Sequence, residues 1–161
     1  MSYLVSLRGP AVQPIKETQQ NQDRQIRLAA YLMSNYPWIL TPTPKFYFTD
    51  YHINKIQGFG RENYIGDLEV KWADRPSSEP YAVPFTKIQQ MLALPLHRDL
   101  PDSYHRILFR FDDGLLMLNI EMLRDLRPVM YTFPGQDELK KLYVFVNASD
   151  FFPYFKPIII R

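Results

Sequence analysis

The sequence predicts a mixed α/β fold in which one central mixed sheet is combined with an N-terminal helix and a second helix after the strand at residues 64–72. Two observations predict it. Helical patterns and alternating strand patterns occur in the order helix, strands, helix, strands. The length of 161 residues, with 46% hydrophobic and 22% charged residues, is typical of one globular domain. We therefore expect a single domain over residues 1–161.

The first helix should cover residues 16–35 and end before Pro37, because the residue before a proline avoids the helical conformation. A short strand at residues 3–7 should precede it, and residues 38–44 should form a link or a short strand. Apolar residues at helical spacing should form the buried face of this helix: Ile26, Ala29, Ala30 and Met33.

The next segment should be an antiparallel hairpin. Residues 45–56 alternate aromatic and β-branched side chains as strands do, and residues 57–63 contain two glycines, which is typical of a turn. Residues 64–72, with the sequence YIGDLEVKW, should return as the second strand.

The second half should contain one more helix and several strands. After a loop at residues 73–80, residues 84–94 predict a helix with Pro84 in its first turn. The apolar segments on either side of Asp112-Asp113-Gly114 predict a tight hairpin. The remaining expected elements are a helical turn at 121–127, strands at 127–133 and 141–148, and a turn at 148–155.

The strand at residues 64–72 carries charged side chains on one face. Since residues i and i+2 of a strand point to the same side, Asp67, Glu69 and Lys71 should project together. With Asp50 from the preceding strand they would suit Mg²⁺, which accepts carboxylate and carbonyl oxygens. Whether Asp50 shares this face depends on strand register, which a glycine bulge would alter. The other interpretation is a solvated face with a weak ion pair.

Asp50 on one strand and Glu69-Val70-Lys71 on the next resemble the motif of the PD-(D/E)XK nuclease superfamily, to which many restriction enzymes, Holliday-junction resolvases and phage-encoded nucleases belong. The resemblance covers roughly residues 16–111. It implies a restriction-endonuclease-like core of helix, three strands, helix and strand, which matches the order of elements expected above.

The resemblance implies a Mg²⁺-dependent DNA endonuclease, either resolvase-like or of the phage type. Asp50, Glu69 and the backbone carbonyl of Val70 would hold Mg²⁺ or Mn²⁺. Lys71 would orient or deprotonate the attacking water or neutralise developing charge. The sequence departs from the common pattern at Thr49, where many members have a proline.

Further candidates surround this motif. Asp67 would replace or assist Asp50 as a metal ligand, and His52 would act as a proton shuttle. Many members carry an acid on the first helix, and some carry a glutamine on the helix after the motif. The candidates for these two positions are Glu17 and Asp23, and Gln89 and Gln90.

DNA is the partner that the resemblance implies, and a homodimer would allow both strands to be cut. The residues expected to contact phosphates flank the hairpin and lie on the second helix: Lys55, Arg61, Arg75, Lys87 and Gln89. The net charge of +2 permits nucleic-acid binding but does not argue for it.

Composition argues against other chemistries. The chain has no cysteine and three histidines, which argues against disulfides, thiolate chemistry and a structural zinc site. Its apolar runs are shorter than a membrane span, and the first ten residues do not resemble a signal peptide. We therefore expect a cytoplasmic protein with neither a membrane partner nor a small-molecule cofactor.

Two other functions stay open at this point. One is a nuclease-like fold that has lost catalysis and acts as a nucleic-acid-binding or assembly protein. The other is an unrelated α+β interaction protein in which the Glu-x-Lys tripeptide occurs by chance.

Overall fold

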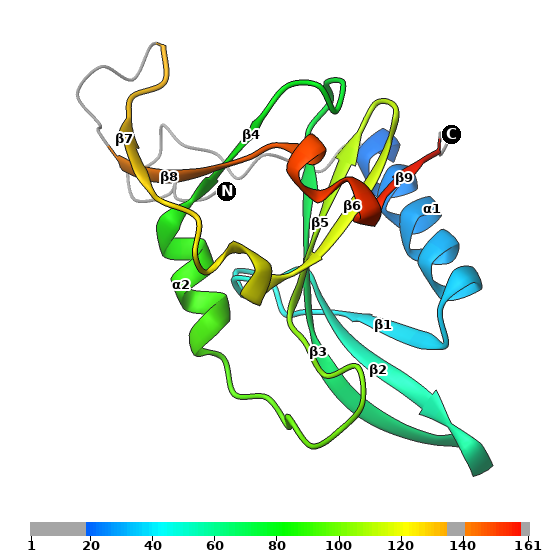
Figure 1. Cartoon of the computed structure of the whole chain (residues 1–161). Coiled ribbons are helices and arrows are strands. Elements are labelled where there is room, and N and C mark those ends of the chain that lie inside the picture. The colour runs from blue at the N-terminus through cyan, green and yellow to red at the C-terminus, as the bar shows by residue number, and fades with distance from the viewer. Residues whose placement is uncertain (1–18, 135–140, 159–161) are drawn as a thin grey trace, which may run out of the picture.

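The computed structural model describes residues 19–134 and 141–158, and it confirms the predicted mixed α/β class (Figure 1). The α-helices are α1 (Gln19–Asn35) and α2 (Phe85–Ala93), and short 3-10 helices cover Gly58–Gly60, Ile120–Leu123 and Ala148–Tyr154. The strands are β1 (Trp38–Pro42), β2 (Tyr51–Gln57), β3 (Arg61–Trp72), β4 (Tyr81–Pro84), β5 (Arg106–Phe111), β6 (Gly114–Asn119), β7 (Val129–Tyr131), β8 (Lys141–Val146) and β9 (Phe155–Pro157). The strand expected at residues 3–7 lies outside the described residues.

Two sheets organise the described chain. The larger has six strands in the order β1-β2-β3-β5-β6-β9, and the smaller has three in the order β4-β8-β7. Within the larger sheet only β3 and β5 are parallel, and every other neighbouring pair is antiparallel. The connection from β3 to β5 contains β4 and α2, as a crossover between parallel strands requires.

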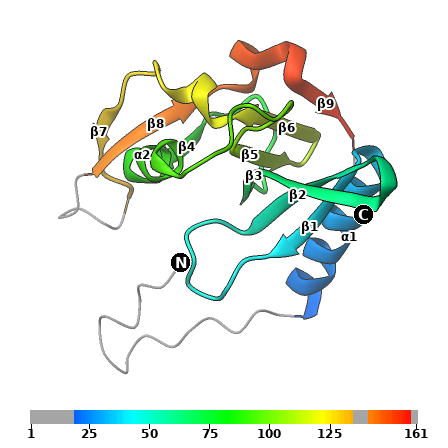
Figure 2. The same ribbon diagram turned by 90° about the horizontal axis from the view of Figure 1, so that it is seen from below.

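The six-stranded sheet is covered on both faces. Helix α1 packs on one face, and α2 with the smaller sheet packs on the other (Figures 1 and 2). The core on the α1 side is built around Leu28, Ile53, Leu68 and Leu108, among others. The core on the α2 side includes residues of α2, β5, β6 and β8: Ile88, Ile107, Phe109, Leu116 and Val144. Neighbouring β5 residues therefore point to opposite cores.

The strand expected at residues 45–56 is shorter than predicted, because β2 begins only at Tyr51. Residues 44–49 form a loop that is closed by a backbone hydrogen bond of 3.0 Å from Thr43 N–H to the Asp50 carbonyl. Phe46 has a φ of 71°, which is outside the extended region. Alternating aromatic residues in this segment therefore belong to a loop, and Asp50 lies where that loop meets the strand.

The expected hairpin is confirmed, and it contains a bulge at Gly66. Tyr51 is opposite Leu68 and Ile53 is opposite Gly66, but Asn54 is opposite Tyr64, so β3 has one extra residue. Gly66 has a φ of 140°, and a Cβ there would lie 2.1 Å from the Tyr104 carbonyl oxygen. Only glycine fits this position.

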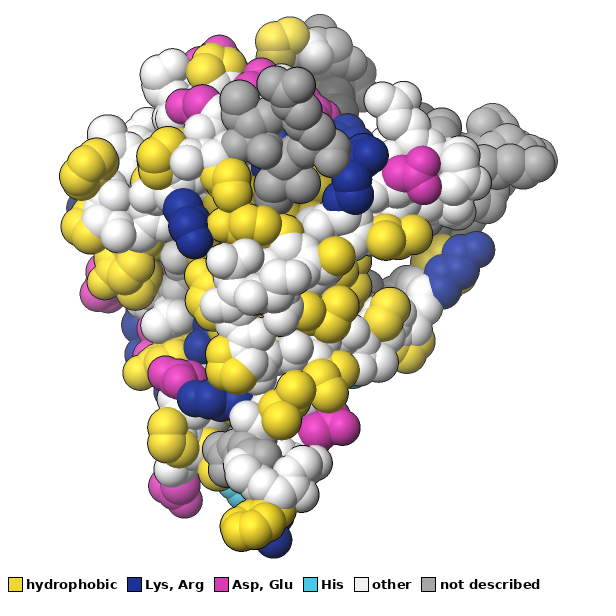
Figure 3. Space-filling model, turned by 90° about the vertical axis from the view of Figure 1, so that its right-hand side faces the viewer, with side chains coloured by type: hydrophobic (Ala, Val, Ile, Leu, Met, Phe, Trp, Pro, Cys, Tyr) yellow, Lys and Arg dark blue, Asp and Glu magenta, His cyan; other side chains and the backbone are white. Residues whose placement is uncertain are grey.

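The predicted buried face of α1 is wrong except for Ala29, which is partly buried against the core on that side. The residues that α1 buries are Leu28 and Leu32, whereas Ile26 and Met33 are 64% and 42% exposed. Both stripes have helical spacing, so only packing against the sheet distinguishes them. Figure 3 views the side of the molecule that carries α1, and hydrophobic and uncharged side chains cover the middle of that face.

The second half follows the prediction more closely. The β5–β6 hairpin turns at Asp112-Asp113 as expected, and α2 begins directly after Pro84. Strand β4, which lies between the expected loop and α2, was not predicted. No helix in the described part of the chain is long and apolar enough to cross a membrane.

Candidate functional site

Strand β3 places Glu69 and Lys71 on the α2 side of the sheet. They are opposite Ile107 and Phe109 of β5, whose side chains belong to the core on that side. Paired residues on neighbouring strands project to the same face. Glu69 is buried, with 6% of its surface exposed, so the predicted charged face is partly enclosed by the protein.

Asp50 joins this face because of the β2–β3 register. Tyr51 is opposite Leu68, so Asp50, the residue directly before β2, is aligned with Glu69. The backbone N–H of Asp50 donates to the Leu68 carbonyl at 3.0 Å, which continues the ladder by one step. The Asp50 Oδ2 accepts a hydrogen bond of 2.7 Å from the Val70 N–H. The Asp50 carboxylate therefore lies against the middle of the Glu69-Val70-Lys71 tripeptide.

The two carboxyl groups interact unfavourably when both are charged. Burial of its carboxyl group and the nearby Glu69 charge raise the pKa of Asp50 from 3.8 to about 6, although the Val70 N–H and Lys71 act in the opposite direction. The residue as a whole nevertheless remains exposed. Ionisation of Asp50 is therefore less favourable here than in water, and a bound cation would favour it.

Two ammonium groups lie on the same oxygen of Glu69. Lys71 Nζ is 3.0 Å and Lys87 Nζ is 3.3 Å from Oε2. Lys87 also donates to the backbone carbonyl of Phe48 and so connects α2 to the loop before Asp50. Burial lowers the pKa of Lys71, but Glu69 and other neighbours outweigh it and the net shift is upward. Lys71 is therefore a cation at neutral pH.

The donor set at this point fits a hard divalent cation. Asp50 and Glu69 provide carboxylate oxygens, and the C=O of Val70 points to the same side as its N–H, toward Asp50, as it does for any residue in an extended strand. Within residues 19–134 and 141–158, no group of three or more His, Cys, Asp or Glu could hold a metal ion. A cation here would be of the magnesium type, which uses one or two carboxylates and completes its shell with water and phosphate oxygens.

Asp67 is on the same face but is used differently from the prediction. Its carboxylate is fully buried and accepts hydrogen bonds from Thr49 Oγ1 at 2.9 Å and from the Tyr64 hydroxyl at 2.6 Å. His52 Nδ1 lies 2.7 Å from Oδ1 of Asp67. Burial and the Asp67 carboxylate raise the pKa of Tyr64, so that hydroxyl stays a donor. These contacts occupy Asp67, which therefore organises its neighbours and is not placed to replace Asp50.

The Asp67 carboxylate orients the His52 ring through its contact with Nδ1. His52 is opposite Asp67 in the sheet and two residues after Asp50 in the chain, which places both side chains on one face. Its ring also meets Tyr47 and Tyr64 edge to face, with centroids 5.7 and 6.0 Å away. Since Nδ1 contacts Asp67, the other ring nitrogen, Nε2, is the one left for another partner.

Most of the predicted DNA-contacting residues lie away from this site. Lys55, toward the far end of β2, pairs with Asp102 at 2.6 Å. Arg61 is exposed beside the hairpin turn, and Arg75 lies over the Tyr81 ring at 5.5 Å. Gln89 is exposed and, two residues after Lys87, faces about 200° away from it around the helix. Only Lys87 reaches the site.

Helix α1 contributes an amide and no acid to the surroundings of Asp50. Glu17 lies outside the described residues, and Asp23 accepts a hydrogen bond of 3.0 Å from Gln19 within the helix. Gln25 lines a cavity of about 90 Å³ together with Asp50 and Val70. Neither Gln25 nor the role of Lys87 at Glu69 was predicted, because both depend on how a helix is rotated against the sheet.

Comparisons with known proteins give no relative. No protein-family model, no curated protein and no solved structure matches the chain.

Proposed function

We propose that this protein is a metal-dependent endonuclease of the PD-(D/E)XK type that hydrolyses phosphodiester bonds in DNA. The observation that carries the proposal is the meeting of two carboxylates, Asp50 and Glu69, at the Val70 backbone, with Lys71 on the same carboxylate. A solvated strand face would not bury Glu69 or raise the pKa of Asp50 to about 6.

The order of elements supports the same proposal. Helix α1 is followed by β1, β2 and β3, then by α2 and by β5, which is parallel to β3. This is the helix, three strands, helix and strand that the resemblance implies, with Asp50 directly before the second strand and Glu69 in the third. The smaller sheet, which includes β4, and strands β6 and β9 of the larger sheet are additions to that order.

In this mechanism Asp50, Glu69 and the Val70 carbonyl are the groups that would hold Mg²⁺. The ion, when bound, neutralises phosphate charge and lowers the pKa of a coordinated water. Lys71 and Lys87 are both held at Glu69 and supply positive charge beside the reacting phosphate. Because the pKa of Lys71 is raised, Lys71 stabilises charge and does not take a proton from water.

We assign proton transfer to His52. Its side chain is on the face of Asp50, and Asp67 orients its ring by contact with Nδ1. An imidazole oriented through Nδ1 presents Nε2 to an attacking water, as oriented histidines do in general base catalysis.

The test is a cleavage assay on a panel of nucleic acids, comprising supercoiled and linear duplex DNA, a four-way junction, single-stranded DNA and RNA, in Mg²⁺, Mn²⁺ or EDTA. We expect metal-dependent cleavage of DNA that falls by roughly 100-fold or more in Glu69→Gln and Lys71→Met. Glu62→Gln, an exposed acid on the same strand, is the matched control and should cleave as the parent does. Undiminished cleavage by Glu69→Gln would refute the proposal.

A second function is favoured by one feature of the site. Two ammonium groups already neutralise Glu69, and no third acid joins it among the described residues. A nuclease-like scaffold that binds nucleic acid without cutting it would have this arrangement. Calorimetry with Mn²⁺ separates the two functions, because a binding protein gives no metal-binding heat and no cleavage of any substrate while retaining affinity for DNA.

A further inference from the structure

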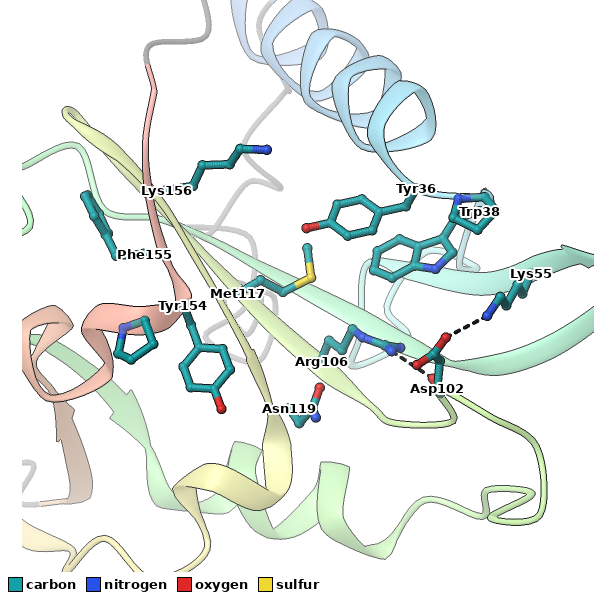
Figure 4. Close-up of a pocket in the computed structure, with 12 residues that line it drawn as sticks. Tyr36, Trp38, Lys55, Asp102, Arg106, Met117, Asn119, Tyr154, Phe155 and Lys156 are labelled. Atoms are coloured by element: carbon teal, nitrogen blue, oxygen red, sulfur yellow. Dashed lines mark hydrogen bonds and ion pairs between the residues drawn. The ribbon is translucent and has the colours of Figure 1, made fainter.

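A second and larger cavity lies on the other face of the six-stranded sheet. It has a volume of about 540 Å³ and is formed where the end of α1 and the start of β1 approach β5, β6 and β9 (Figure 4). Arg106 of β5 is opposite Leu68, whose side chain belongs to the α1-side core. The cavity is therefore on the α1 face, whereas Glu69 and Lys71 point to the α2 face. Its volume is typical of small-molecule sites.

Aromatic rings form two walls of this cavity. Tyr36 stacks on Trp38 with ring centroids 4.3 Å apart and an angle of 15° between the planes. Tyr36 is 37% exposed and Tyr154, which lies on the other side of Met117, is 51% exposed (Figure 4). A flat ring that entered between the two tyrosines would stack on exposed aromatic surface and lie over the Met117 thioether.

Cations surround the aromatic walls. The lining contains Lys55, Arg106 and Lys156 against a single carboxylate, Asp102, which Lys55 already neutralises at 2.6 Å. The cavity therefore has a net positive charge and suits an anionic group.

Arg106 is held in place before any ligand arrives. The residue is buried, with 7% of its surface exposed. Its Nη1 donates to the Tyr104 carbonyl at 3.0 Å, and its Nη2 donates to the Asp102 carbonyl at 2.7 Å. The guanidinium carbon lies 4.9 Å from the centre of the Trp38 ring. Two of five N–H donors are used in these bonds, so a preorganised guanidinium still has donors for an anion.

We propose that this cavity binds a nucleoside 5′-phosphate, either free or as the end of a nucleic-acid strand. The base stacks between Tyr36 and Tyr154, the side-chain amide of Asn119, which also lines the cavity, pairs with its edge, and the phosphate lies beside Arg106 and Lys156. A purely apolar ligand would leave the net positive charge of the lining, which Asp102 offsets only at Lys55, without a compensating anion, and inorganic phosphate alone would leave the aromatic walls uncovered. A nucleoside 5′-phosphate provides a flat ring for the aromatic walls and an anion for the positively charged lining.

The proposal does not depend on nuclease activity. The two sites are on opposite faces of the sheet and share no residue. Binding at the cavity is therefore measured in EDTA, where the metal site is inactive and no strand is cut, so that failure of one proposal leaves the other standing.

The test is isothermal titration calorimetry of the full chain in EDTA with four probes: adenosine 5′-monophosphate, adenosine, inorganic phosphate and a short single-stranded oligonucleotide with a 5′-phosphate. We expect the nucleotide or the oligonucleotide to bind with a Kd below roughly 1 mM, and adenosine and phosphate to bind at least about tenfold more weakly. Binding of the free nucleotide identifies a small-molecule site, and binding of the oligonucleotide alone identifies a strand end.

Two variants and their matched controls locate the binding. Tyr154→Ala should weaken binding by about tenfold, whereas Phe152→Ala, an exposed aromatic in the same 3-10 helix but outside the cavity, should not. Lys156→Gln should weaken binding of phosphorylated probes only, and Lys141→Gln, an exposed lysine of β8, should change nothing. All four positions are exposed or partly exposed, so we expect thermal unfolding to be unchanged. No binding of either phosphorylated probe, or equal binding by parent and Tyr154→Ala, would overturn the proposal.

Discussion

The Lys87 ammonium lies 3.3 Å from Oε2 of Glu69, the same oxygen that Lys71 contacts at 3.0 Å. Lys87 comes from α2, so a helix outside the motif supplies half of the positive charge at the buried carboxylate. A cation that binds Glu69 must share it with these two ammonium groups.

Removal of Lys87 should separate metal binding from catalysis. We expect Lys87→Met to bind Mn²⁺ about 3- to 10-fold more tightly, because one repelling charge is lost, and to cleave DNA at least tenfold more slowly. Calorimetry and cleavage rates measure the two effects. Lys141→Met, in the smaller sheet, should alter neither quantity. Weaker Mn²⁺ binding by Lys87→Met would contradict the assigned role.

Asp50 should make metal binding dependent on pH. Its pKa of about 6 means that the carboxylate is half protonated at pH 6, and a proton must leave before a cation binds. Below pH 6 we expect Mn²⁺ affinity to fall by up to about tenfold per pH unit, and above pH 7 to be nearly constant. Calorimetry at several pH values checks this. A flat affinity between pH 5 and 7 would exclude Asp50 as a ligand.

The same pKa predicts a stabilising substitution. Because the folded-state pKa lies above the usual 3.8, protonation of Asp50 favours the folded protein, and this contribution is full below pH 4 and lost as pH rises through 6. Asp50→Asn carries no charge at any pH. We expect it to be more stable than the parent by about 1–2 kcal/mol at pH 8, after allowance for solvent screening of an exposed residue, and not at pH 4. Urea unfolding at both pH values measures the difference.

His52 should affect the rate of cleavage and not the binding of metal. His52→Gln keeps a group that donates to Asp67 but cannot accept a proton from water. We expect cleavage to fall by about 100-fold with a changed pH–rate profile, and Mn²⁺ affinity to remain as in the parent. His97→Gln, an exposed loop position, is the control. A parental rate for His52→Gln would remove His52 from the mechanism.

Asp67 should matter for stability. Asp67→Asn replaces one accepting carboxylate oxygen by an NH2 group that only donates. That NH2 group would face a donor, Thr49, His52 or Tyr64, so at least one buried hydrogen bond would be lost. We expect a loss of about 2–4 kcal/mol in the free energy of unfolding. Asp74→Asn, which breaks only the exposed pair with Arg24, should cost less than about 1 kcal/mol. Equal losses for the two variants would show that the buried network contributes nothing.

Gly66 should tolerate no side chain. Gly66→Ala forces a Cβ to within 2.1 Å of the Tyr104 carbonyl oxygen at a φ of 140°, so either the bulge or the Tyr104 backbone must move. We expect a loss of at least about 3 kcal/mol in unfolding free energy, with reduced cleavage because the bulge is part of the Asp50 register. A Cβ added at Gly58 has no atom within 4 Å, so Gly58→Ala should leave the unfolding free energy nearly unchanged. Denaturant unfolding compares the two.

Much of the fold was predictable from local patterns. The alternation of YIGDLEVKW correctly predicted a strand with Glu69 and Lys71 on one face, because successive side chains of a strand always point to opposite sides. Asp112-Asp113-Gly114 correctly predicted the β5–β6 hairpin from the conformational preferences of turn residues. The sequence therefore determined the mixed α/β class, the hairpins and the charged face of β3.

Tertiary structure alone decided which residues meet. Pairing with β3 aligned Asp50 with Glu69, and the bulge at Gly66 ended that register three residues later; a shift by one residue would have moved Asp50 to the other face. Packing against the sheet chose Leu28 over Ile26 as the buried stripe of α1 and turned Lys87 of α2 toward Glu69. Hydrogen-bond registers and helix rotations join residues far apart in the chain, and local patterns do not specify them.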